Sequence, residues 1–243
     1  MKRIKVGLWP QWLISSLPNR SLTSTNNLTN KQSSLSQVYL WQALNIYDDI
    51  LDEGKNIKKL PLANFYFRNF LQIFYESKPP LILKTRTKKL WQNLEKFHQA
   101  ELKQGKILWV KQKIKYQSSS LILKLNNLAD KSLVLAIMPI TLACQKKQDL
   151  NYWQIKKLFE LFKYLLITKQ LADDVKDWED DLKSNQLTIV TKFLLDRLKQ
   201  EKIKINKKNY IYQVKIIFIK SGALMFSQKI IKISKKTRKI AQE

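Results

Sequence analysis

The sequence predicts an all-α protein, and three observations lead to this class. The chain of 243 residues holds only four Gly and six Pro, fewer turn-forming residues than β-rich or doubly wound α/β folds use. Apolar residues make up 44% of the chain, which is enough for a full hydrophobic core at this length. Apolar residues also recur at steps of three and four over long stretches, the period of a buried helix face. We therefore expect a single-domain helical bundle.

The elements expected from this period follow one another along most of the chain. Residues 1–34 are predicted to be poorly structured or to form a short helix, because Ser, Thr and Asn dominate their second half. Residues 35–243 are predicted to form the helical domain, with Pro139 as a kink. The expected helices cover 35–54, 62–77, 83–105, 107–129 (one helix or two), 130–145, 150–182, 188–199 and one or two more from 206 onward.

The net charge and the scarcity of histidine and cysteine restrict the functions that the chain could have. The chain has 45 Lys and Arg against 19 Asp and Glu, a formal net charge of +26. Such an excess of positive charge favours binding to nucleic acid, to an acidic membrane surface or to a diphosphate, and it does not discriminate among these three. A single histidine, His98, and a single cysteine, Cys144, argue against a zinc site, a histidine-based triad and an internal disulfide. Because no stretch is long enough to span a bilayer, we expect a cytoplasmic protein.

A first carboxylate cluster ends the predicted helix 35–54. Asp48 and Asp52 are four residues apart and share one helix face, and Asp49 lies about 100° around the axis. They follow the apolar run 41–47, so their mutual repulsion is expected in a recessed place. A compensating cation is therefore expected there.

A second carboxylate cluster lies in the predicted helix 150–182. Asp173, Asp177 and Asp181 recur every four residues, and Asp174 flanks this stripe. Carboxylates without His or Cys suit Mg²⁺, which takes one or two carboxylates plus phosphate oxygens. The pair of D-D-x-x-D patterns predicts a Mg²⁺-dependent diphosphate site, against the alternative of two solvated acidic faces. The predicted metal ligands are Asp48, Asp49, Asp52, Asp173, Asp174, Asp177 and Asp181.

These two clusters resemble the aspartate-rich motifs of the class I isoprenoid synthase superfamily, which includes the trans-polyprenyl diphosphate synthases and the squalene and phytoene synthases. Asp48-Asp49-x-x-Asp52 is similar to the first motif, and Gln170-x-x-Asp173-Asp174-x-x-Asp177 to the second. The resemblance covers roughly residues 36–200. It implies a bundle of the isoprenoid synthase type with two facing aspartate-rich helices, Mg²⁺ as cofactor, an allylic prenyl diphosphate as substrate and, by analogy, a homodimer.

The resemblance also implies roles for single residues. Asp48, Asp52, Asp173 and Asp177 would be catalytic through the bound metal. Gln170 belongs to the second motif, and Lys176 stands where the squalene and phytoene form has an arginine. Lys131 with Ser132 resembles a Lys-Thr pair that contacts diphosphate, and Arg86 is a further candidate for that contact. Gln170, Lys131, Arg86 and Lys176 are therefore the predicted substrate-binding residues.

Three functions follow from these observations. The first is ionisation of an allylic prenyl diphosphate with prenyl transfer to a second isoprenoid. The segment 1–5 matches the upstream isopentenyl diphosphate element of polyprenyl synthases poorly, which disfavours head-to-tail elongation. The second is a terpene cyclase acting on one prenyl diphosphate. The third is a non-catalytic basic protein that binds anionic membrane through the helix 229–239, or nucleic acid, for which no specific motif is present.

Overall fold

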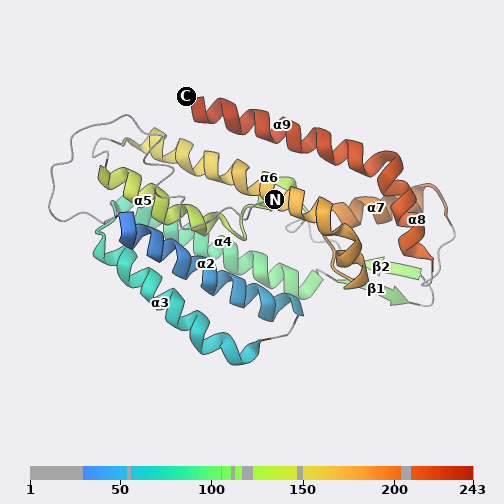
Figure 1. The fold of residues 1–243 in the computed structure, drawn as a ribbon, viewed down its shortest axis with the longest axis horizontal. Helices are drawn as coiled ribbons and strands as arrows, with labels where there is room; N and C mark the ends of the chain where they lie inside the picture. Colours follow the sequence, from blue (N-terminus) through green and yellow to red (C-terminus); the bar gives the residue numbers. More distant parts are fainter. Residues whose placement is uncertain are drawn as a thin grey trace. The chain divides into compact units, whose positions relative to one another are not determined.

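A computed structural model describes residues 30–53, 56–104, 106–110, 113–116, 123–146, 150–203 and 209–242. Within these ranges most residues are helical, which confirms the all-α class (Figure 1). The chain divides into two compact units, unit 1 from residues 1–92 and 133–159 and unit 2 from residues 93–132 and 160–243. Two helices, α4 (Leu81–Gln104) and α6 (Tyr152–Lys183), run from one unit into the other. None of the described helices is both long and apolar enough to cross a lipid bilayer.

Unit 1 is built around α2 (Asn30–Glu53), which packs along α3 (Leu60–Glu76) and also contacts the short η4 (Leu133–Ala136) and α5 (Ile137–Lys146). The 3₁₀ turn η2 (Ile57–Lys59) precedes α3. The amide of Gln37 on α2 donates to the Leu135 carbonyl at 2.8 Å. Every residue of α5 from Ile137 to Cys144 is buried, so α5 is the interior helix of this unit.

Unit 2 holds a β-hairpin and the C-terminal helices. Strands β1 (Ile107–Val110) and β2 (Lys113–Tyr116) pair antiparallel, and the short η3 (Leu125–Asn127) follows. The N–H of Ile107 donates to the Asn185 carbonyl at 2.8 Å, which joins the hairpin to the end of α6. The remaining elements are α7 (Ile189–Gln200), α8 (Tyr210–Ile217), the π-helical turn η5 (Phe218–Gly222) and α9 (Ala223–Gln242).

The prediction of helix over 107–129 is wrong, because the structure forms the β1–β2 hairpin and a 3₁₀ turn there. The hairpin pairs Ile107 with Tyr116 and Trp109 with Ile114. β-branched and aromatic residues of this kind favour strands. Ile107 and Ile114 are buried while Leu108 and Val110 are exposed, so the burial has the period of a strand rather than of a helix.

The predicted helix 130–145 is also corrected. Turns and the 3₁₀ segment η4 precede α5, which begins only at Ile137. Pro139 therefore lies in the first turn of α5 rather than inside a longer helix, at a place where a missing N–H is tolerated. At the other end of the chain, α2 begins at Asn30, inside the segment 1–34 that was predicted to be poorly structured or to form a short helix. Residues 1–29 lie outside the described ranges.

Thr188 begins α7 through a capping box. Its hydroxyl accepts from the N–H of Thr191 at 3.2 Å, and the Thr191 hydroxyl oxygen accepts from the N–H of Thr188 at 2.8 Å. We expect Thr188→Ala to lower the free energy of unfolding by about 1 kcal/mol, as measured by urea denaturation, because one helical N–H loses its acceptor. Thr188→Ser keeps the hydroxyl and should retain most of this stability. An equal loss for both variants would contradict the capping role.

Candidate active site

Helix α6 carries the second acidic cluster, and its start is set by local hydrogen bonds. The Asn151 side chain accepts from the N–H of Gln154 at 3.0 Å, and the Gln154 side chain accepts from the N–H of Asn151 at 3.1 Å. This reciprocal pair is a capping box. The 32 residues that follow contain neither Gly nor Pro, so nothing interrupts the helix before the acidic segment.

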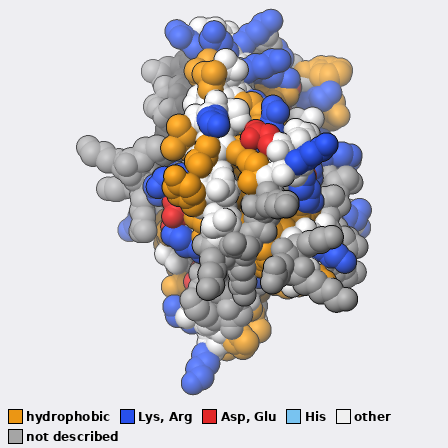
Figure 2. Space-filling model, turned by 90° about the vertical axis from the view of Figure 1, so that its right-hand side faces the viewer, with side chains coloured by type: hydrophobic (Ala, Val, Ile, Leu, Met, Phe, Trp, Pro, Cys, Tyr) orange, Lys and Arg blue, Asp and Glu red, His pale blue; other side chains and the backbone are white. Residues whose placement is uncertain are grey.

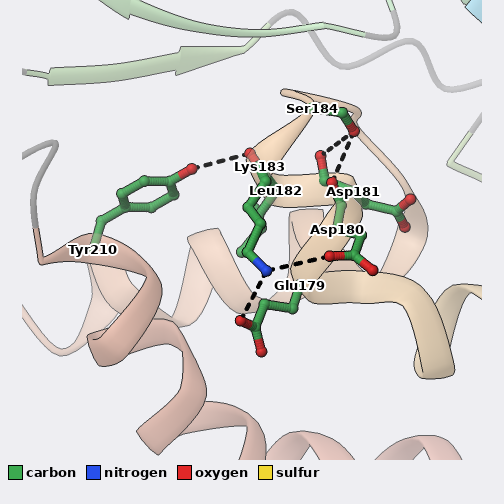
Figure 3. Close-up of polar contacts among 7 residues, drawn as sticks. All are labelled: Glu179, Asp180, Asp181, Leu182, Lys183, Ser184 and Tyr210. Atoms are coloured by element: carbon green, nitrogen blue, oxygen red, sulfur yellow. Dashed lines mark hydrogen bonds and ion pairs between the residues drawn. The ribbon is translucent and has the colours of Figure 1, made fainter.

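The end of α6 is held by Ser184 and Asn185, which follow it directly, and by Tyr210 of α8. The Ser184 hydroxyl donates to the carbonyls of Asp180 and Asp181 at 2.8 and 3.1 Å (Figure 3). Asn185 adopts a left-handed conformation with φ of 59°, which is a common helix stop. From α8, the Tyr210 hydroxyl donates to the Leu182 carbonyl at 3.0 Å. The carbonyls at the end of α6 thus accept from side chains as well as from the backbone, and the acidic turns are fixed in place.

Asp174 is the buried carboxylate of the cluster. It lies in the same row of α6 as the buried Leu171 and Trp178 and is only 6% exposed. The Gln170 amide donates to Asp174 Oδ1 at 2.9 Å. Burial raises the pKa of Asp174 to about 6; the Gln170 hydrogen bond and the Lys131 charge oppose the rise, and the Asp173 and Asp177 charges add to it. A charged group on the apolar face of a helix destabilises the fold, so its presence indicates a role other than packing.

Asp181 is half-buried and lies about two turns further along α6. Burial, followed by the charges of Asp174 and Asp177, raises the pKa of Asp181 to about 7, and a hydrogen bond with Thr188 works against this rise. Figure 3 shows the Asp181 side chain directed away from Lys183. Lys183 instead pairs with Glu179 at 3.1 Å and with Asp180 at 3.2 Å. Lys183, the basic residue of the last turn, therefore neutralises Glu179 and Asp180 and not Asp181.

Asp173 and Asp177 are the solvent-accessible members of the cluster. Their side chains are 40% and 51% exposed and pair with Lys169 at 2.7 Å and Lys176 at 3.3 Å, respectively. Lys176, a predicted substrate-binding residue, is itself 80% exposed. Exposed pairs of this kind are weak. Both carboxylates can therefore exchange a lysine for a cation of higher charge at little cost.

The first cluster lies at the C-terminal end of α2 in unit 1. Asp48 is partly exposed and Asp49 is exposed, with the Asn56 amide 3.3 Å from Asp49 Oδ2. The side chain of Asp52 lies outside the described part of the structure. The last turn of α2 has no basic residue, and these carboxylates lie at the negative end of the helix dipole. A cation bound there would offset the negative charge of the carboxylates and of the helix end.

The structure brings the predicted site residues of α6 and Lys131 together in unit 2, whereas Arg86 lies in unit 1. Gln170 and the four aspartates 173, 174, 177 and 181 lie within roughly 100° of the α6 circumference. Lys131 acts electrostatically on Asp174 and belongs to the same surroundings. Arg86 lies in unit 1 with its guanidinium 5.3 Å from the centre of the Phe159 ring, a cation–π contact.

Two residues of the site escaped the sequence prediction. Thr188 was expected only as the start of a helix, and its T-x-x-T capping pattern gave no sign of the bond to Asp181. Lys169 could have been found, because its place four residues before Asp173 is the spacing of a helical ion pair.

The donor set fits Mg²⁺ without forming a closed metal site. Among the described residues, no three His, Cys, Asp or Glu side chains come together closely enough to hold an ion. Carboxylates one helical turn apart are about 5–6 Å apart at Cβ, so one ion can take one or two of them. Mg²⁺ usually completes its shell with water and phosphate oxygens. Burial is the main cause of the raised pKa values of Asp174 and Asp181, and the charges of neighbouring aspartates add to it; a bound cation would offset both effects.

A scan against models of protein families finds no match to this chain. No curated protein and no solved structure is significantly similar to it. The superfamily resemblance therefore stays a prediction, and the candidate site rests on the residues themselves.

Proposed function

We propose that this chain is a Mg²⁺-dependent class I isoprenoid synthase that ionises an allylic prenyl diphosphate and transfers the prenyl group to a second isoprenoid. The observation that carries the proposal is the unit 2 arrangement around Asp174. A buried carboxylate is oriented by Gln170, influenced by Lys131 and flanked by the accessible Asp173 and Asp177. A solvated acidic face has no reason to place one carboxylate in the apolar row of its helix.

The residues divide into three roles. Asp173 and Asp177 are the accessible oxygen donors of α6 that would hold Mg²⁺. The superfamily resemblance gives Asp48, Asp49 and Asp52 the same role in unit 1. Gln170 is a positioning residue, because it acts through Asp174. The ammonium of Lys131 supplies a positive charge for the diphosphate. Bound Mg²⁺ would neutralise the charge that develops on the departing diphosphate.

The proposed reaction begins with heterolysis of the bond between the allylic carbon and the diphosphate oxygen. Its electron pair leaves with the diphosphate, and an allylic carbocation remains. The double bond of the second isoprenoid then forms the new carbon–carbon bond, and loss of a proton completes the product. Transition-state charge builds on the leaving oxygen, where preorganised cations have the largest effect on rate. The protein therefore has to hold and neutralise the diphosphate more than it has to transfer protons.

The experiment that tests the proposal measures diphosphate release from geranyl, farnesyl and geranylgeranyl diphosphate. Each substrate is supplied with and without isopentenyl diphosphate, in Mg²⁺ and in EDTA, and products are extracted for mass spectrometry. We expect turnover in Mg²⁺ that EDTA abolishes, with a product longer than the substrate. A cyclic hydrocarbon or alcohol of unchanged carbon number would identify a terpene cyclase instead. Absence of both turnover and Mg²⁺-dependent substrate binding would refute the assignment.

A further inference from the structure

The C-terminal helices of unit 2 expose apolar side chains along one line. The buried residues of α8, η5 and α9 include Val214, Ile217, Gly222, Phe226 and Ile233. On the exposed side, Tyr212, Ile219, Leu224 and Ile231 are 66%, 68%, 65% and 53% exposed. These four residues are spaced by seven, five and seven positions. Seven residues make nearly two α-helical turns, so each spacing of seven keeps its pair on one face.

The π-helical turn η5 keeps the middle pair, Ile219 and Leu224, on that face as well. Five residues in a plain α-helix would rotate Leu224 by about 140° from Ile219. A π-turn closes i→i+5 bonds, and the five residues of η5 bring Leu224 back toward the line of Ile219. On the opposite side, a Cβ on Gly222 would lie 3.3 Å from the Leu194 side chain of α7. The glycine thus permits close packing of the inner face while the outer face stays continuous.

All charged side chains of these helices are basic. Between Asn209 and Gln242 the sequence contains no Asp or Glu. Lys229 lies over the Phe226 ring at 5.5 Å, and Lys236 pairs with Glu160 of α6 at 3.9 Å. The other basic residues of this stretch are all exposed: Lys215, Lys220, Lys232, Lys235, Arg238 and Lys239. Figure 2 shows Lys and Arg side chains gathered at the upper part of the displayed face, with hydrophobic side chains between them.

From this juxtaposition we infer that the outer face of α8, η5 and α9 docks on an anionic lipid bilayer. Exposed lysines are attracted to acidic headgroups, and their aliphatic stems can lie along the apolar phase while the ammonium groups stay in the headgroup layer. Ile219, Leu224 and Ile231 would enter the boundary between headgroups and acyl chains, as in interfacial helices. This inference does not depend on the proposed enzymatic function.

The chemistry of this face favours a bilayer over nucleic acid. Proteins that bind single strands stack bases on aromatic side chains, and Tyr212 is the sole aromatic among the four exposed apolar residues of this line. The other three are aliphatic and have no stacking surface. Phosphates would satisfy the lysines in either case, but only a lipid phase also removes these aliphatic side chains from water.

The test is vesicle co-sedimentation of the full chain at about 0.1 M salt. Vesicles of phosphatidylcholine alone are compared with vesicles containing about one third phosphatidylserine. We expect binding to the anionic vesicles only. Because each charge near such a surface changes the binding constant by about fivefold, Lys232→Glu/Lys235→Glu should weaken binding by tenfold or more. The matched control Lys88→Glu/Lys89→Glu removes two exposed lysines of α4 and should stay within about twofold of the wild type, since a general charge effect would change both variants alike.

A second variant tests the apolar part. Ile219→Ser/Leu224→Ser changes no charge and alters two side chains that are already largely exposed, so its thermal melting should match that of the wild type. We expect it to weaken vesicle binding severalfold. Equal binding by wild type and Lys232→Glu/Lys235→Glu would overturn the inference. It would also fail if anionic vesicles were not bound while a single-stranded oligonucleotide was bound in a manner sensitive to the same lysines.

Discussion

Asp173→Asn is expected to reduce Mg²⁺-dependent diphosphate release by roughly 100-fold or more. Asp173 is one of the two accessible carboxylates of the α6 cluster, and asparagine keeps its size while removing the charge that holds a divalent cation. A loss of about 3 kcal/mol in transition-state stabilisation corresponds to about two powers of ten in rate. Steady-state release of diphosphate from the best allylic substrate measures the effect, and raising the Mg²⁺ concentration should restore part of the rate.

Asp180 provides the matched control for this substitution. It is on the same helix and is 83% exposed, and it pairs with Lys183 rather than facing the cluster. Asp180→Asn should therefore retain turnover within about twofold, since an exposed ion pair contributes little. If Asp173→Asn and Asp180→Asn lost activity equally, or if neither lost any, the aspartate stripe would not be the catalytic surface.

The second large effect concerns stability and pH. In the metal-free protein the folded-state pKa of Asp174 is about 6, against an ordinary value of 3.8. The folded state therefore binds more protons than the unfolded state between these values, and the free energy of unfolding falls as pH rises through this window. Asp181, with a pKa of about 7, acts in the same direction. We expect the metal-free protein to be more stable near pH 5 than near pH 8.

Asp174→Asn isolates this contribution. At pH 8 the wild-type carboxylate is charged in both states, and a shift of about two pKa units corresponds to at most about 3 kcal/mol of destabilisation. The variant should be more stable than the wild type at pH 8, with the difference shrinking toward pH 4, as measured by denaturant unfolding in EDTA. Lower stability of the variant at pH 8 would show that hydrogen bonding, and not charge burial, governs this position. Gains of stability on removing a functional group are a common trade-off.

Helix positions were largely predictable because a buried face imposes its period on the sequence. The expected helix 150–182 differs from α6 by two residues at its start and one at its end. The β1–β2 hairpin was missed because a short apolar segment fits the period of a helix and the period of a strand equally well. The deciding contact, from Ile107 to Asn185, joins residues far apart in the chain. Pro139 was misplaced for a related reason, since a proline marks either a kink or a helix start.

The candidate site was predictable in its composition and not in its environment. Four-residue spacing places Asp173, Asp177 and Asp181 on one stripe in any helix, and Gln170 precedes it by one turn. Asp174, predicted only to flank the stripe, is the most buried carboxylate of the cluster. Its row on α6 also contains Leu171 and Trp178, and the sequence does not show which row faces the core. That choice depends on the neighbouring elements that cover the helix.

The sequence by itself determined the helical class, the two acidic clusters and the basic character of the C-terminal helix, because these depend on composition and on spacing within single helices. Tertiary packing alone decided that Asp174 is desolvated and that η5 aligns the exposed face of α8 and α9. The physical reason is that burial is set by contacts between elements. Helical periodicity says which residues share a face and not what that face meets.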